Sequence, residues 1–267
     1  MRLIEVPAKT GYVWFRQGIW LFRRNPLAFL TLFFTYLLAM TLLSSIPLIG
    51  GVLPLMLVPG VAVGFMAACR DTVAGKPVFP TILIDGFRRY GSGVAKRLLT
   101  LGGAYAIAMM LVLAASALVD GGMLLRLMTL GGTLDAQSLE TSNVPLAMLA
   151  SIVAYVPVSM LFWFAPVLAA WHDVPPVKAL FFSIVSCWRN KGAFAVYGAL
   201  WFAVSITVSI GLSTLMRAIG AADYAVAVLM PALIIVTTML YCSFYATYRG
   251  CFGVQESQAA ELPGAGL

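Results

Sequence analysis

Long apolar runs separated by short polar segments dominate the pattern of this chain. Six of these runs have about the 20 residues that a helix needs to cross a bilayer. They cover residues 27–46, 52–69, 98–119, 146–170, 193–216 and 225–248. The first two runs are joined only by Pro47-Leu48-Ile49-Gly50-Gly51, which stops one helix and turns the chain into a hairpin. The pattern therefore predicts an all-α integral membrane protein with six transmembrane helices.

The composition supports a membrane protein over a soluble one. Hydrophobic residues make up 61% of the chain and charged residues only 10%, whereas a soluble domain carries about 25% charged residues. We expect residues 1–254 to form a single membrane domain and the small, polar residues 255–267 to form a disordered cytoplasmic tail. The first apolar run lacks a small-residue cleavage site, so we expect it to stay in the membrane as an anchor.

The positive charges are distributed very unevenly between the two sides of the predicted membrane domain. Of the 17 Lys and Arg residues, all but Arg126 and Arg217 fall in the N-terminal segment, the second and fourth loops or the tail. Segments rich in Lys and Arg stay in the cytoplasm. The distribution predicts a multi-pass protein of the bacterial inner membrane with both termini in the cytoplasm.

A degenerate repeat precedes the first, third and fifth spans. Its three copies are Phe22-Arg23-Arg24-Asn25-Pro26, Phe87-Arg88-Arg89-Tyr90-Gly91 and Trp188-Arg189-Asn190-Lys191-Gly192. The stretches before these aromatic–arginine steps look amphipathic; in the first, Tyr12, Phe15, Ile19 and Phe22 recur at helical spacing. Amphipathic helices of this kind lie in the membrane interface. We therefore expect three repeats, each an interfacial helix followed by a transmembrane hairpin.

Prolines distinguish the even-numbered spans from the odd-numbered ones. They are Pro54, Pro59, Pro157, Pro166 and Pro231. Each proline removes a backbone donor and frees a carbonyl, which a bilayer cannot satisfy. We therefore expect the even spans to be kinked and to face protein, with the prolines near a common axis.

Two sets of residues are candidates for binding and packing. Arginine forms bidentate contacts with phosphate, so the arginines of the three steps are candidates for gripping anionic lipid head groups. They are Arg23, Arg24, Arg88, Arg89 and Arg189. The alternative is that these arginines serve only as topology signals. Gly60 and Gly64 form a GxxxG pattern, which favours close packing of the second span.

Residue types that the sequence lacks argue against several classes of function. The central parts of the six spans hold no Asp, Glu, Lys, Arg or His, which argues against an ion-coupled transporter or pump. His172 is the one histidine, and the four cysteines form no CxxC pair, so we expect free thiols and neither a metal nor a cofactor. No nucleophile elbow, phosphate-binding loop or carboxylate pair is present. We therefore predict that the protein is not an enzyme.

Two stretches carry a resemblance to known proteins. Residues Trp14-Phe15-Arg16-Gln17-Gly18-Ile19-Trp20-Leu21-Phe22-Arg23-Arg24-Asn25-Pro26, and Ala165-Pro166 through to Trp188-Arg189-Asn190, resemble an uncharacterised family of bacterial six-span inner-membrane proteins. The layout is also similar to the membrane domain attached to some glycerophosphodiester phosphodiesterases. The catalytic domain of those enzymes is absent here, so this second likeness implies no hydrolase activity.

Two hypotheses for function follow from these patterns. The first is a non-enzymatic scaffold that binds lipid or a partner. Its expected partners are membrane lipids, anionic ones among them, together with another membrane protein or a second copy of the chain, and no nucleic acid. The alternative is a carrier or permease for a lipidic or weakly polar small molecule, which would use the proline-containing spans to open and close.

The charge distribution gives a test of topology. We expect reporters fused after Val254 or before Trp14 to be cytoplasmic, and one inserted within residues 131–143 to lie outside, because positive loops are retained in the cytoplasm. Paired reporters that are active on opposite sides of the membrane make the measurement. A C-terminal reporter on the outside would contradict the six-span topology.

Overall fold

The computed structural model describes residues 3–123 and 144–253. These residues form helices, turns and irregular segments, with no strand among them. Six of the helical segments are long and apolar enough to cross a membrane: Pro26–Ser44, Leu53–Val73, Ser92–Asp120, Leu146–Trp171, Lys191–Ala218 and Ala222–Phe252. They confirm the predicted fold class and six spans. The predicted tail, 255–267, lies outside the described ranges.

Helices make up most of the residues that the structure describes. In chain order they are α1 (Thr10–Arg24), α2 (Pro26–Ser44), α3 (Leu53–Val73), η1 (Pro80–Ile84), α4 (Asp85–Arg88), α5 (Ser92–Asp120), α8 (Val144–Phe162), α9 (Ala165–Trp171), α10 (Pro176–Arg189), α11 (Lys191–Ala218), η2 (Ala222–Tyr224) and α12 (Ala225–Phe252). They group into two compact units. The first comprises Met1–Leu37, Gly64–Asp85 and Ser186–Leu267, and the second Leu38–Val63 and Gly86–Val185.

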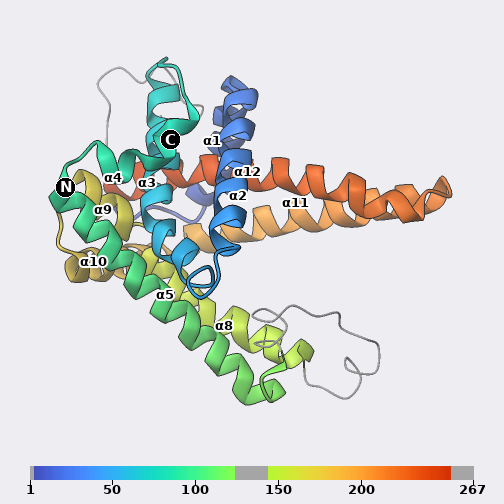
Figure 1. The fold of residues 1–267 in the computed structure, drawn as a ribbon. Coiled ribbons are helices and arrows are strands. Elements are labelled where there is room, and N and C mark those ends of the chain that lie inside the picture. The colour runs from blue at the N-terminus through green and yellow to red at the C-terminus, as the bar shows by residue number, and fades with distance from the viewer. Residues whose placement is uncertain (1–2, 124–143, 254–267) are drawn as a thin grey trace. The chain divides into compact units, whose positions relative to one another are not determined.

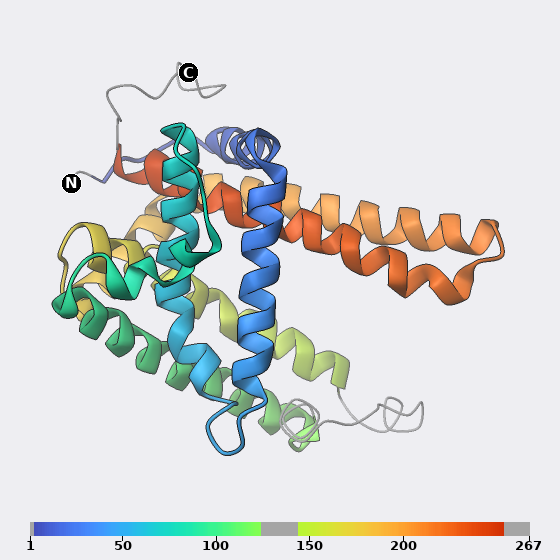
Figure 2. The ribbon, with the colours of Figure 1, turned by 45° about the horizontal axis from the view of Figure 1, so that its top comes forward.

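In the first unit, α11 and α12 run side by side as a hairpin (Figures 1 and 2). Helix α1 packs against both of them. The contact lies at the start of α11 and the end of α12. There the ring centroids of Trp14 on α1 and Phe194 lie 5.2 Å apart in a tilted arrangement, and Gly250 lies against the Trp14 ring. Farther along α11, Phe202 and Ile210 are exposed. Large apolar side chains on the outside of long helices are typical of a surface that faces lipid.

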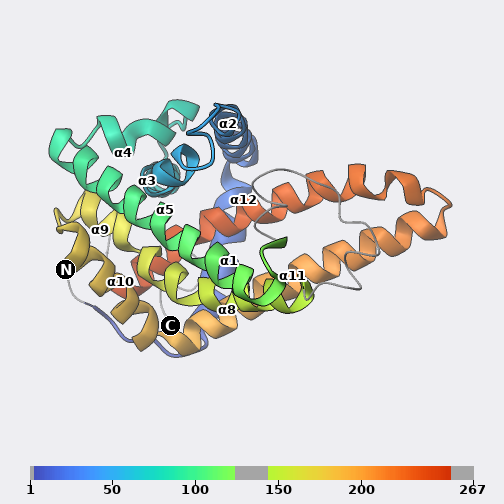
Figure 3. The same cartoon turned by 60° about the horizontal axis from the view of Figure 1, so that its bottom comes forward.

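In the second unit, α5 and α8 lie side by side and α9 also packs against α5 (Figure 3). The rings of Tyr105 and Phe162 meet edge to face at 5.1 Å across the α5–α8 contact. Helix α9 is short, and its residues from Ala165 to Ala170 are all buried. The apolar core of this unit is therefore centred on α9 and the half of α5 that faces it.

A helix ends within each of the three aromatic–arginine steps, at Arg24, Arg88 and Arg189. The first break is built by Asn25 and Pro26: the Asn25 side-chain oxygen accepts a bond from the N–H of Ala28 at 3.3 Å, and proline suits the first position of a helix. The preceding helices are unequal, with 15 residues in α1, 14 in α10 and only 4 in α4. The middle step therefore lacks a long interfacial helix, and the three-repeat architecture stays a prediction.

The fourth span is broken, and a serine closes the break. Helix α8 ends at Phe162 and α9 begins at Ala165, next to Pro166. The hydroxyl of Ser183, on α10, accepts a bond from the N–H of Phe164 at 2.9 Å and donates one to the carbonyl of Met160 at 2.7 Å. That N–H and carbonyl would bond each other in an unbroken α-helix. The hydroxyl therefore replaces the missing helical bond: it accepts from the N–H and donates to the carbonyl. A bilayer could satisfy neither of these backbone groups.

The environments of the prolines match the sequence expectation only in part. Pro59 and Pro166 are buried, and Pro54 is half-buried. Pro157 and Pro231 are exposed, so the expectation that every proline turns towards protein is wrong for these two. The proline ring is itself apolar, so its exposure to lipid carries no desolvation cost.

The Ser183 bridge predicts a defined loss of stability. Ser183→Ala removes the hydroxyl that bonds both the N–H of Phe164 and the carbonyl of Met160, and losing a hydrogen bond to a buried backbone group costs about 1–3 kcal/mol. We expect a clearly lower midpoint of thermal unfolding in detergent. Ser159→Ala is the matched control, because the Ser159 hydroxyl bonds the carbonyl of Val156 in its own helix. Equal midpoints for the two variants would show that the bridge contributes nothing.

Candidate lipid head-group site

Helix α1 is amphipathic, as predicted, but the face that packs against protein differs from the apolar stripe predicted for the membrane interface, and the two share Phe22. The buried residues are Gly11, Trp14, Gly18, Leu21 and Phe22, whereas Tyr12 is 49% exposed. The two glycines explain the difference, because they let α1 approach its neighbours closely. A Cβ atom added to Gly11 would lie 2.2 Å from the carbonyl oxygen of Ala193, and one added to Gly18 would lie 2.4 Å from the Cβ of Ser243.

The outer face of α1 carries aromatic and arginine residues in alternation. Tyr12, Arg16, Trp20 and Arg24 follow at four-residue intervals, so they share one ridge of the helix. The Arg16 guanidinium lies over the Tyr12 ring at 5.7 Å, and that of Arg24 over the Trp20 ring at 4.4 Å. These contacts have cation–π geometry. We call these four residues the aromatic–arginine ladder.

An open groove runs along this outer face. Its volume is about 530 Å³, and its lining comprises Arg16, Ile19, Trp20, Arg23 and Arg24. Within residues 3–123 and 144–253, no carboxylate forms an ion pair with any of these three arginines. Among the described residues, the three positive charges of this basic groove have no paired carboxylate, and they lie beside an indole ring. Such an arrangement suits phosphate, which arginine binds in a bidentate manner.

The predicted head-group arginines of the other two steps lie in different settings. Arg88 and Arg89 are exposed around the end of α4. Arg189, at the end of α10, pairs with Glu5 at 2.7 Å between Nε and Oε1. The charge of Arg189 is thus already matched by a carboxylate, whereas Arg23 and Arg24 lie in the basic groove. The first step is therefore the strongest candidate of the three.

The two glycines of the predicted packing motif lie against the segment that follows α3. A Cβ atom on Gly60 would lie 2.0 Å from the ring of Phe87, and one on Gly64 would lie 2.6 Å from the carbonyl oxygen of Ile82. Their neighbours are thus α4 and η1. That packing explains why small residues are needed at both positions.

Asn190 fixes the segment that leads into α1. Its side chain is almost fully buried and has three hydrogen bonds: its oxygen accepts from the N–H of Val6 at 2.8 Å, and its nitrogen donates to the carbonyls of Ile4 at 3.1 Å and Ser186 at 3.0 Å. The N–H of Ile4 donates to the carbonyl of Cys251 at 2.8 Å. The segment before α1 is therefore bonded both to the α10–α11 junction and to the end of α12.

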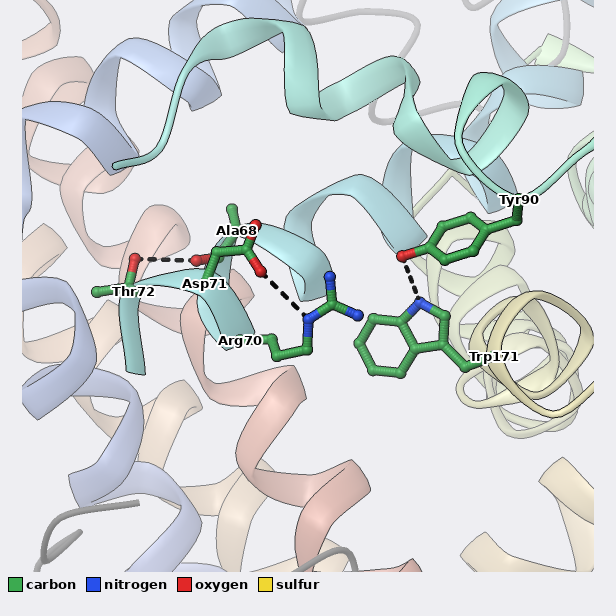
Figure 4. Close-up of polar contacts among 6 residues, drawn as sticks. All are labelled: Ala68, Arg70, Asp71, Thr72, Tyr90 and Trp171. Atoms are coloured by element: carbon green, nitrogen blue, oxygen red, sulfur yellow. Dashed lines mark hydrogen bonds and ion pairs between the residues drawn. The ribbon is translucent and has the colours of Figure 1, made fainter. Parts of the chain in front are cut away.

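Other polar contacts have a structural role within their own unit. In the second unit, the indole N–H of Trp171 donates to the Tyr90 hydroxyl at 3.0 Å (Figure 4), and Arg97 pairs with Asp173. The hydrogen bond and charge of Arg97 hold the pKa of the Asp173 carboxyl below its usual value. Partial burial lowers the pKa of His172, which favours the neutral imidazole. The Trp171–Tyr90 hydrogen bond and the Arg97–Asp173 ion pair stabilise the turn after α9.

Candidates for metal or redox chemistry are few. Among the residues that the structure describes, no group of three or more His, Cys, Asp or Glu is placed to hold a metal ion. The four cysteines are free thiols, as predicted, and all are buried. Burial raises the pKa of the Cys187 thiol, so this side chain stays protonated and unreactive near neutral pH.

Arg16 and Trp20 were not predicted as site residues. The predicted head-group arginines all belong to the three aromatic–arginine steps, and Arg16 lies two helical turns before the first of these steps. The signal was nevertheless present, because the alternation of aromatic residue and arginine at intervals of four is readable from the sequence.

Comparison with known proteins gives one informative match. A protein of Burkholderia thailandensis described as a probable inner membrane protein is 69% identical over 265 residues, which cover 98% of this chain and 98% of that protein. No family model matches the chain. No solved structure matches it. These findings support the resemblance to an uncharacterised inner-membrane protein and give no support to the likeness with glycerophosphodiester phosphodiesterases.

The close approach of α1 predicts a difference between two glycine substitutions. Gly18→Ala forces α1 away from Ser243, and overpacking of this kind costs about 1–3 kcal/mol. Gly198→Ala on α11 meets nothing within 4 Å, so it should leave stability unchanged or raise it slightly, since alanine favours a helix. Thermal unfolding in detergent compares the two variants. Gly18→Ala as stable as Gly198→Ala would contradict the close packing of α1.

Proposed function

We propose a lipid-binding role for this chain, which belongs to the family of the Burkholderia thailandensis probable inner membrane protein. On this proposal the chain is a non-enzymatic scaffold of the bacterial inner membrane that binds anionic lipid head groups. One observation carries it: the basic groove holds Arg16, Arg23 and Arg24 with no carboxylate paired to them in the described part of the chain. Six helices suited to crossing a membrane place this groove in a membrane protein.

The position of α1 along the chain supports binding at the head-group level. Arg24 is the last residue of α1, and the first span starts at Pro26. Only Asn25 separates the basic end of the groove from the membrane-spanning segment. Aromatic and arginine side chains at such a boundary place their rings among the head groups and their charges near the phosphates.

The energetics favour lipid over free solvent as the neighbour of the groove. Each surface cation gains about 1 kcal/mol from an anionic leaflet. The ring contacts of Arg16 and Arg24 also restrict their side chains before a ligand arrives, so less conformational entropy is lost on binding. Three neighbouring arginines therefore give an attraction that a single surface cation does not.

The proposal predicts the effect of removing charge from all three steps. We expect the variant with Gln at Arg23, Arg24, Arg88, Arg89 and Arg189 to bind fewer anionic lipids, because the phosphate ligands are lost. Native mass spectrometry of the full chain, purified with lipid, counts the bound molecules. An unchanged count would leave these arginines as topology signals alone.

The lysines of the chain supply a matched control. Lys9, Lys76, Lys96, Lys178 and Lys191 are all exposed, so changing them to Gln removes the same charge. We expect this control to keep most of its anionic lipid. Equal losses in both variants would show a general charge effect and would contradict a head-group site. A C-terminal topology reporter on each variant checks that the orientation in the membrane is unchanged.

A further inference from the structure

The basic groove has two positively charged positions, one at each end. Arg16 and Arg24 are eight residues apart on the same ridge, which places their Cα atoms about 12 Å apart along the helix axis. Arg23 also lines the groove, next to Arg24, so one position holds one guanidinium and the other holds two. Trp20 lies between them on the ridge and contacts Arg24. The groove therefore carries two cationic positions, and the Trp20 ring lies against the guanidinium of one of them.

A ligand that matches this layout carries two phosphates on one short backbone. A single phosphate group reaches the arginines of one end only, and the other end stays unmatched. Two phosphates joined by a glycerol bring charge to both ends, while the apolar side chain of Ile19, which also lines the groove, suits the carbon linker. A groove of about 530 Å³ falls within the usual range for a small-molecule site.

We propose that the basic groove is a site for a lipid with two phosphate groups, in which two phosphatidyl units are joined by glycerol. This inference rests on the proposed function and names its lipid class. The ligand is a membrane lipid because the Arg24 end of the groove adjoins the start of the first span at Pro26. Once one phosphate is bound, the second binds at high effective concentration, so a two-phosphate lipid outcompetes two separate one-phosphate lipids.

The buried side of α1 makes this groove a fixed site. Trp14, Gly18 and Leu21 hold the inner face against α11 and α12. Arg16 and Arg24 both belong to this single helix, so the spacing between the two ends is set by helix geometry. A ligand with the right spacing thus meets a prearranged pair of charges.

A competition experiment tests the inference. The full chain is mixed in detergent with diphosphatidylglycerol, phosphatidylglycerol and phosphatidylcholine at equal lipid phosphate, and native mass spectrometry reports what is bound. We expect the wild type to prefer diphosphatidylglycerol over phosphatidylglycerol by about tenfold or more. Arg16→Gln removes one end of the groove and should bring the two anionic lipids close to parity.

A control variant and an alternative ligand show whether the preference depends on Arg16 and on a lipid. Lys9→Gln removes an exposed charge just before α1 and should keep the wild-type preference. Arg16 is exposed, so its substitution should leave thermal unfolding unchanged, and the same measurement checks this. Inorganic pyrophosphate that binds the lipid-free chain as tightly as diphosphatidylglycerol would show that a soluble diphosphate is recognised and would overturn the lipid assignment.

Different results would overturn the two-phosphate inference alone or the proposed function as well. Equal binding of the two anionic lipids by the wild type, or an unchanged preference in Arg16→Gln, would overturn the two-phosphate inference and leave the proposed function standing. No preference for either anionic lipid over phosphatidylcholine would overturn both.

Discussion

A bilayer offers no hydrogen-bond partner to a backbone N–H or C=O group, and this constraint governs where the helices of the protein end. The break in the fourth span is possible because the Ser183 hydroxyl bonds both freed groups. The junction between α1 and the first span uses the Asn25 side chain. At the junction of α10 and α11, the Asn190 amide satisfies the backbone of the incoming N-terminal segment. Three short polar side chains thus determine how the long apolar helices are connected.

Helix α1 shows how the same chain builds a candidate site on such a scaffold. Its glycines bring one face against α11 and α12, which leaves the opposite face free to carry the arginines. The buried face of α1 has no charged residue, and its arginines lie on the exposed face. This single helix of 15 residues therefore has one face that packs against protein and one that carries positive charge.

The spans and the breaks between them could be predicted from the sequence, because apolar length and an Asn-Pro or Gly step are local signals. The buried face of α1 could not, since Gly11 and Gly18 contribute nothing to a hydrophobic pattern and their role depends on remote helices. The pairing of Arg189 with Glu5 joins residues far apart in the chain, as does the bond of Ser183 to the fourth span. Such tertiary partners leave no trace in local spacing, which is why the three steps looked more alike than they are.

The bonds of the N-terminal segment have a consequence for the order of assembly. Ile4 precedes all six spans along the chain, yet its N–H bonds the carbonyl of Cys251, close to the end of the last span. Helix α1 likewise packs against α11 and α12. During synthesis the Trp14 face therefore stays uncovered by its full set of partners until all six spans have been inserted. A helix that precedes every span is thus among the last to dock, so its docking reports that all six spans have been inserted.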